Sequence, residues 1–446
     1  MSSTPLAQAV QSTFAPGGPL AQAAEGFVAR DGQTQLAQAV ARTIGQGGVL
    51  VAEAATGVGK TFAYLVPALL SGERVLVSTA TKTLQDQLFG RDLPRLARAL
   101  GVPARMALLK GRSSYLCLHR LEFAGESSDL RMTGARHALS KIERWSKTTR
   151  TGDLAELPGL DERSPVIPLV TSTRENCLGA DCPKFRGCHV NVARREAMAA
   201  DVVVINHHLF FADLAIRESG MAELLPTVRV AIFDEAHQLN ETGIQFLGQQ
   251  LATGQLLDFA RDVLGAGLQQ ARGLCDWTQL ASGVEMAARD LRMAVGQVRG
   301  ASRLRWTAVA WQASLARLHT ALTDAAAALD TVSELAPDFV RLHERARLLA
   351  GRTQRFAAPC DVALVRWADV SQSLRLVESP LDIADTVRTR LLAAPEGEGP
   401  ARAWVFVSAT LGDDARLSWF TQPCGLQDAE VLRIGSPFDY ARQAAL

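Results

Sequence analysis

Two short segments carry residue types suited to nucleotide chemistry, and the first is AATGVGKT at residues 54–61. It fits the phosphate-loop pattern Gly-x-x-x-x-Gly-Lys-Ser/Thr except at its first position, which is alanine. Glycines let successive backbone N–H groups turn toward a polyphosphate. We expect Lys60 to reach the terminal phosphates and Thr61 to bind Mg²⁺. The residues assigned to the nucleotide here are Ala54, Ala55, Thr56, Gly57, Val58, Gly59, Lys60 and Thr61.

The second segment is DEAH at residues 234–237, directly after the apolar run 228–233. Asp234 is expected to hold the magnesium ion, mostly through water, and Glu235 to orient and deprotonate the attacking water. His237 has no second metal-ligand type spaced with it, so we interpret it as a link between the nucleotide and a bound polymer. Lys60, Asp234 and Glu235 are thus the predicted catalytic residues.

Gln33 lies upstream of the phosphate loop, in the sequence FVARDGQ. Its amide can act as paired donor and acceptor toward adenine, which would favour ATP. A solvent-exposed glutamine is the alternative interpretation.

Four of the seven cysteines, Cys117, Cys177, Cys182 and Cys188, are separated by 59, 4 and 5 intervening residues. Four thiolates can hold a tetrahedral zinc ion or an iron–sulfur cluster. Zinc sites usually show two close pairs, which this spacing does not. Unrelated buried thiols remain a third possibility, and the isolated Cys275, Cys360 and Cys424 are interpreted as small apolar residues.

Short apolar strands alternating with helices must position these residues. Strands are expected at 49–52, 74–79, 105–110, 201–205, 228–233 and 403–407. The segments that carry the candidate catalytic and binding residues follow the carboxyl ends of these strands. This arrangement predicts an α/β fold with a doubly wound parallel sheet. The hydroxyls of Thr79 and Thr81 suit helix capping, with a phosphate contact as the alternative.

The region from about 240 to 358 reads as helical. Apolar residues from Trp311 to Leu329 recur every three or four positions and continue from Phe339 to Leu349, which predicts two antiparallel helices. Residues 362–370 and 374–378 suit a strand hairpin or two edge strands. Ser379 to Asp382 resembles a helix start with proline at the first position, and 395–400 resembles a linker.

Composition sets outer limits on function. The 446 residues carry 47 Lys plus Arg against 46 Asp plus Glu, so any nucleic-acid contact must come from a local basic surface. No secretory leader or membrane-length apolar run is present, which predicts a soluble cytoplasmic protein without membrane contact.

Basic residues gather near the cysteines and around Trp145, a combination that suits single-stranded DNA. A solvated helix face is the alternative for each residue taken singly. The members are Lys184, Arg186, Arg194, Arg195, Arg131, Arg136, Lys141, Arg144, Lys147 and Arg150.

Several motifs, in this order, resemble the XPD/DinG-type superfamily 2 helicases with an iron–sulfur domain, most closely the bacterial YoaA branch. They are RDGQ from Arg30, EAATGVGKT, STATKTLQDQL, LLKGRSSYLC, CLGADCPKFRGC, DVVVINHHLF, IFDEAHQL, VSATL and GSPFDY, ending at Tyr440.

The resemblance implies an ATP- and Mg²⁺-dependent helicase moving 5′ to 3′ on single-stranded DNA and acting in DNA repair or replication, with DNA junctions and an accessory protein as further partners. It implies a 4Fe-4S cluster on the four cysteines named above and adds Arg30 to the nucleotide-binding residues. Ser408 and Thr410 would couple the nucleotide state to DNA. The cluster domain and helical arch would stand beside the motor domain and form an opening for one strand.

The resemblance also implies a domain plan. A RecA-like motor domain would cover 27–112, 196–239 and 359–446. An iron–sulfur domain at 113–195 and a helical arch at 240–358 would interrupt it. From composition alone, residues 1–26, rich in Ala, Gln, Gly and Pro, are expected to form a flexible lead-in or a short loose helix. A second motor domain is expected to be missing, so these residues alone should bind ATP and DNA weakly and unwind nothing.

Two other functions fit part of the sequence. A zinc-bearing phosphate-loop ATPase that remodels a protein partner would need no DNA. A non-enzymatic DNA-structure binding module would leave Lys60, Thr61, Asp234 and Glu235 without a role.

Overall fold

The computed structural model describes residues 4–23, 28–125, 133–161, 163–218, 224–296, 300–305, 311–393 and 401–438. Phe27, Arg131, Tyr440 and the expected linker at 395–400 lie outside these ranges. The chain forms two compact units. The first unit comprises Met1–Lys110, Ala193–Leu247 and Asp382–Leu446, and the second comprises Gly111–Val192 and Gly248–Leu381.

The first unit contains a seven-stranded sheet in the order β11-β1-β10-β5-β2-β4-β3. Its strands are β1 (Gly48–Ala54), β2 (Val75–Thr79), β3 (Met106–Leu108), β4 (Val202–Asn206), β5 (Val230–Asp234), β10 (Ala403–Ser408) and β11 (Glu430–Ile434). Every described pairing in it is parallel. The expected α/β class with a parallel sheet is confirmed, and β11 is a strand that the sequence patterns did not indicate.

Both faces of this sheet are covered, because its strands are apolar on both sides. Val405 and Ile232 point into a core shared with helices α1, α3, α4 and α6. On the alternate positions, Phe233 stacks on Phe406 with ring centroids 4.9 Å apart, and Phe210 of α11 packs against Phe233. The helices are α1 (Pro5–Phe14), α2 (Pro19–Ala23), α3 (Asp31–Gln46), α4 (Lys60–Leu70), α5 (Lys82–Gln87), α6 (Leu93–Leu100), α11 (His207–Glu218), α12 (Leu239–Leu247), α17 (Ala384–Thr386) and α18 (Ser418–Thr421).

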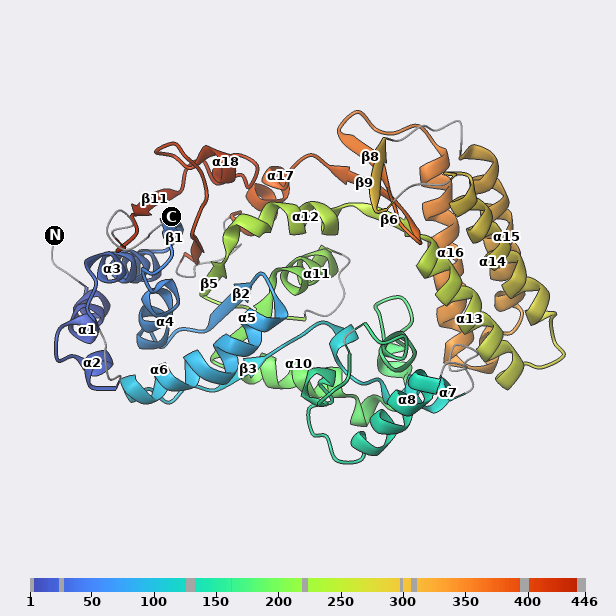
Figure 1. The fold of residues 1–446 in the computed structure, drawn as a ribbon, viewed down its shortest axis with the longest axis horizontal. Helices are drawn as coiled ribbons and strands as arrows, with labels where there is room; N and C mark the ends of the chain where they lie inside the picture. The colour runs from blue at the N-terminus through green and yellow to red at the C-terminus, as the bar shows by residue number, and fades with distance from the viewer. Residues whose placement is uncertain are drawn as a thin grey trace. The chain divides into compact units, whose positions relative to one another are not determined.

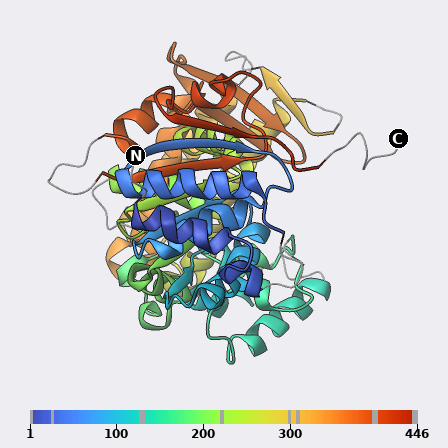
Figure 2. The same cartoon turned by 90° about the vertical axis from the view of Figure 1, so that its left-hand side faces the viewer.

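The amino-terminal segment differs from the expected flexible lead-in. Thr4 caps α1, and Val10 and Phe14 are 0% and 2% exposed within the core of the first unit. Figure 2 is viewed from the side of these helices and shows α1 lying along α3. The low complexity of this segment hid an amphipathic helix with a built-in cap.

The second unit combines four long helices with a four-stranded antiparallel sheet in the order β6-β9-β8-β7 (Figure 1). The helices are α13 (Thr253–Gln270), α14 (Trp277–Met293), α15 (Gln312–Asp330) and α16 (Pro337–Ala357). The strands are β6 (Gln249–Ala252), β7 (Ser302–Arg305), β8 (Leu364–Val370) and β9 (Leu374–Pro380). The predicted packing of these two helices along their apolar faces is confirmed, because Leu318 and Leu322 of α15 and Leu349 of α16 are fully buried in one core.

Two details of the carboxyl-terminal third were predicted wrongly. The hairpin β8–β9 was expected in the motor domain, but it pairs with β6 and β7 in the second unit. Pro380 ends β9 and does not open a helix, because Ser379 and Pro380 continue the ladder with β8. The helical turn α17 begins later, and the Asp382 carboxylate accepts a hydrogen bond from the N–H of Ala384.

The cysteine-bearing region lies in the second unit around a small core of its own that includes Leu116, Ile142, Val166 and Val170. Its helices are α7 (Leu118–Ala124), α8 (Thr133–Trp145), α9 (Ile167–Val170) and α10 (His189–Ala199), the last of which crosses into the first unit. The separation into a cluster domain and an arch domain therefore stays a proposal. None of the described helices has the length and apolar character needed to cross a membrane.

Candidate nucleotide site and cysteine cluster

The phosphate loop joins the end of β1 to the start of α4, as its sequence predicted. Gly57 and Gly59 have φ of 88° and 87°, a left-handed conformation that favours glycine. Val58 is buried and anchors the loop, while Thr56 and Gly57 face solvent. The Lys60 ammonium donates to the carbonyl of Ala54 across the loop at 3.2 Å. With α4 beginning at Lys60, the positive end of the helix faces the space inside the loop.

Two side chains fill the places where the loop glycines lack a Cβ. A Cβ on Gly59 would lie 2.2 Å from the Gln33 amide nitrogen, and one on Gly57 would lie 2.1 Å from the Phe438 ring. Gln33 is only 4% exposed and donates to the carbonyl of Gly59 at 2.9 Å. The solvent-exposed alternative for Gln33 is therefore wrong. Arg30 lies half-buried at the start of the same helix, α3.

Sheet topology brings Asp234 and Glu235 to the phosphate loop. Strand β10 lies between β1 and β5, with Ser408 opposite Glu53 and Val407 opposite Asp234. The carboxyl ends of these parallel strands meet at one edge of the sheet, where α/β folds bind ligands. Glu235 then takes a left-handed backbone with φ of 55°, uncommon for a residue with a side chain.

Asp234 is buried, and its charge state responds to its neighbours. Burial, followed by the charge of Glu235, raises the pKa of Asp234 to about 6. The Tyr64 hydroxyl and the Lys60 ammonium act in the opposite direction and lower this pKa. A magnesium ion would compensate the same buried carboxylate. Lys60 and Asp234 are therefore close enough to share one site.

The raised pKa predicts a pH-dependent effect of Asp234→Asn on the metal-free protein. The native state favours the protonated carboxyl, so wild type loses stability as the pH rises from the ordinary aspartate pKa of 3.8 past about 6. The asparagine variant should then be more stable than wild type at pH 8, by at most about 3 kcal/mol. Its advantage should shrink at pH 5.

Urea unfolding in the presence of a chelator at both pH values measures this difference. Asp428→Asn, at an exposed position, serves as the control. An advantage of Asp234→Asn that grows toward pH 5 contradicts the assigned burial.

A hydrogen-bonded group links the DEAH segment to the end of β10. His237 Nδ1 lies 2.9 Å from Ser408 Oγ, which donates to Glu235 at 3.4 Å. Ser408 is buried, and Thr410 is exposed two residues later. His237 and Ser408 therefore lie together, beside the Glu235 carboxylate that is expected to orient the attacking water.

The four cysteines of the predicted cluster lie near one another in the second unit. Burial raises the pKa of Cys117 and Cys182, and the charges of the other cysteines raise it further. Arg112 donates to the Cys177 sulfur at 3.0 Å, and the Gly179 N–H donates to the same sulfur at 3.4 Å. In the described ranges, no group of three or more His, Cys, Asp or Glu side chains is placed to hold one metal ion.

Comparison with known proteins agrees with this site. Residues 33–136 match the DEAD/DEAH box helicase family. The chain is 40% identical over 448 residues to the ATP-dependent DNA helicase YoaA of Escherichia coli strain K12, covering 97% of this chain and 68% of the relative. The chain belongs to the XPD/DinG-type helicase family. As a member it is an ATP-hydrolysing helicase.

Other matches in this family are partial. The ATP-dependent helicase DinG of Mycobacterium tuberculosis strain H37Ra is 36% identical over 267 residues, covering 55% of this chain and 39% of the relative. A solved structure of S. tokodaii Xpd4 has a TM-score of 0.44 and 12% identity, covering 91% of this chain and 61% of that chain.

Two side chains at the helicase site were missed by sequence reasoning. Tyr64 is fully buried, and the Asp234 carboxylate and Thr61 hydroxyl both affect its pKa, which burial raises well above the usual value. Its position one helical turn after Thr61 was the available signal. Glu53 accepts from the N–H groups of Leu411 and Gly412 at 2.7 and 3.2 Å, and no local pattern reveals such a pairing.

The basic residues of the second unit are only partly available to a ligand. Lys184 pairs with Glu122 at 2.5 Å, and Lys141 donates to the carbonyl of Pro158. Arg186 and Lys147 are exposed. The capping interpretation of Thr81 is supported, because its hydroxyl accepts from the N–H of Leu84 at 3.2 Å at the start of α5.

Proposed function

We propose that this helicase acts on DNA, moves 5′ to 3′ along single strands in repair or replication, and carries a 4Fe-4S cluster. The observation that carries the motor part of the proposal is the meeting of the phosphate loop with Asp234 and Glu235 at one sheet edge. The DNA part rests on relatives such as the E. coli protein, whose name describes a DNA helicase.

The proposed roles follow from the chemistry of phosphoryl transfer. The loop N–H groups and Lys60 bind and neutralise the phosphates, while Thr61 and Asp234 hold Mg²⁺. Glu235 accepts a proton from the attacking water, with Ser408 and His237 fixing its carboxylate. Tyr64 lies beside Asp234, where its hydroxyl favours the charged form of the carboxylate by lowering its pKa.

Adenine recognition is proposed for Gln33, with Arg30 beside it. The Gln33 amide nitrogen already donates to Gly59, and its carbonyl oxygen remains able to accept from the adenine amino group. Gln33 would then connect the bound base directly to the phosphate loop through its hydrogen bond to Gly59. This arrangement supports the preference for ATP.

The donor set suits an iron–sulfur cluster. Cys117, Cys177, Cys182 and Cys188 would ligate it, and the Arg112 guanidinium would offset the negative charge of thiolates. When bound, the cluster supplies four strong iron–thiolate bonds that cross-link segments far apart in sequence. Zinc on the same thiols is the alternative that accompanies a protein-remodelling ATPase.

The stimulation of ATP hydrolysis by single-stranded DNA tests the proposed function. We expect hydrolysis to rise at least about tenfold with the polymer, because a helicase couples the two ligands, and the salt dependence should be steep. A rate unchanged by DNA, together with zinc and no iron in the purified protein, would favour the remodelling ATPase. Forked duplexes with a single 5′ or 3′ tail report polarity.

Cytoplasmic location, a preference for DNA junctions and an accessory partner stay predictions.

A further inference from the structure

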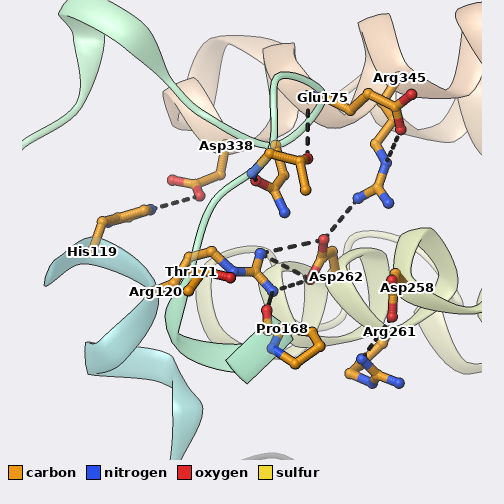
Figure 3. Close-up of polar contacts among 12 residues, drawn as sticks. His119, Arg120, Pro168, Thr171, Glu175, Asp258, Arg261, Asp262, Asp338 and Arg345 are labelled. Carbon is orange, nitrogen blue, oxygen red and sulfur yellow. Dashed lines mark hydrogen bonds and ion pairs between the residues drawn. The ribbon is translucent and has the colours of Figure 1, made fainter. Parts of the chain in front are cut away.

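A cavity of about 290 Å³ in the second unit separates the cysteine-bearing segments from two of the long helices. Its walls come from α7, from the loop at 175–178, and from α13 and α16. Most of the lining is apolar, but one wall consists of charged side chains held in pairs, which Figure 3 shows in close-up. Through these charged pairs the cysteine-bearing segments contact helices α13 and α16 directly.

Asp262 of α13 is the centre of the charged wall. It accepts hydrogen bonds from Arg120 of α7 at 3.3 Å and from Arg345 of α16 at 2.7 Å (Figure 3). Arg120 also donates to the carbonyl of Pro168 at 3.2 Å. The side chains of Arg120, Asp262 and Arg345 are only 17%, 16% and 4% exposed. One carboxylate thus joins three elements.

Glu175 forms the second junction of the same network. It accepts from Gln255 and from Arg352, both at 2.8 Å, and lies 3.8 Å from the Arg345 guanidinium. Its side chain is 15% exposed. Arg345 therefore bridges Asp262 and Glu175, and the five charges alternate in sign from Arg120 to Arg352.

Two members of this network adjoin the proposed cluster ligands in sequence. Arg120 follows Cys117 by three residues, and Glu175 precedes Cys177 by two. His119 of α7 also contacts Asp338 of α16 at 3.0 Å, which is a further link between these segments and the long helices. The Lys184–Glu122 pair, by contrast, joins two cysteine-bearing segments to each other. The two segments that bring distant cysteines together are thus the two fixed to α13 and α16.

Energetics favour a positional role over simple stabilisation. Buried ion pairs recover little net free energy, but removing one partner leaves the others uncompensated and is strongly destabilising. Asp262 has two arginine partners, so its loss would take the nearest carboxylate from both and leave Arg120 with only the carbonyl of Pro168 and Arg345 with the more distant Glu175 among the contacts named above. Such a network holds α7, α13 and α16 in one relative position and disfavours other arrangements of these helices.

We propose that Asp262 and Glu175 are positioning residues that couple metal occupancy of the four cysteines to the docking of α13 and α16. This inference rests on the proposed cluster. A bound cluster fixes the spacing of Cys117 and Cys177, and hence of Arg120 and Glu175, which together grip the two helices. Linkage is reciprocal, so docking of the helices must also raise the affinity of the four cysteines for the cluster. We expect a more tightly held cluster to be lost more slowly.

The first test is the rate at which a chelator removes iron from the purified holoprotein, followed by visible absorbance. Asp262→Asn should accelerate release at least about fivefold, the lower range of measured couplings between sites. Asp258→Asn is the matched control, one turn earlier on α13, where the carboxylate pairs only locally with Arg261 in the described contacts. Equal rates for the two variants would overturn the proposal.

Glu175→Gln provides a second, nearly isosteric variant if Asp262→Asn does not fold. It should accelerate iron release in the same direction, and a rate equal to wild type would overturn the proposal. Absence of iron from wild type would instead refute the proposed cluster, so the two failures are distinguishable.

Hydrogen exchange supplies the reciprocal readout. Removing iron from wild type should increase amide exchange in α16 around Arg345 and Arg352, because the grip on that helix is released. The iron-dependent difference should be much smaller in Asp262→Asn than in Asp258→Asn. An α16 that exchanges identically with and without iron in wild type would overturn the proposal.

Discussion

Glu235→Gln should lower the rate of DNA-stimulated ATP hydrolysis by about 10²- to 10⁴-fold, the range typical of a lost general base. Glutamine keeps the shape and can still accept from Ser408 Oγ, but it cannot take a proton from water. ATP affinity should change little, because the phosphates are held by the loop and Lys60. Steady-state hydrolysis and fluorescent-nucleotide titration measure the two quantities separately.

The matched control is Glu241→Gln, an exposed acid in the first turn of α12 a few residues away. It should retain the wild-type rate. A Glu235→Gln protein that hydrolyses ATP at more than about a tenth of the wild-type rate would remove Glu235 from the role of base. A protein that no longer binds ATP would indicate a structural role for the left-handed turn instead.

Cys182→Ser should abolish the brown colour and the bound iron of the purified protein. A serine hydroxyl is a poor ligand for iron in place of a thiolate, and the remaining three cysteines do not complete the set of four thiolates that holds such a cluster. The change should also lower the thermal stability of the second unit, since metal binding contributes to folding free energy. Iron content and visible absorbance give the result directly.

Cys275→Ser and Cys360→Ser are suitable controls, because both cysteines lie in the same unit and are partly exposed outside the four-cysteine group. Both variants should keep the wild-type iron content. If Cys182→Ser keeps all of its iron, Cys182 is not a ligand. If wild type contains bound zinc instead of iron, the four cysteines form a zinc site and the cluster proposal is wrong.

The nucleotide site was predictable because its functional residues lie in two short, contiguous motifs. A phosphate loop needs glycines, lysine and threonine at fixed spacing, and the strand before Asp234 is apolar on both faces. Parallel pairing then brings the two segments to one edge without any further information. The paired helices α15 and α16 were predictable for the same reason, since their periodicity is local.

The remaining features depend on contacts between distant residues. Glu53 reaches Leu411, and Asp262 reaches Arg120, across long stretches of sequence. A charged residue in a single sequence looks the same whether it faces solvent or closes a buried network. Strands β6, β7 and β11 are short, and their pairing partners rather than their residue types decide their conformation.

The burial of α1 has a practical consequence for anyone who shortens this protein. The recognisable motifs begin at Arg30, which invites expression of a version trimmed to them. Removing the first 23 residues would remove Val10 and Phe14 from the core that they share with α3 and α4 and would expose an apolar surface there. Such a trimmed protein would tend to precipitate, and its poor behaviour could be mistaken for a defect in catalysis.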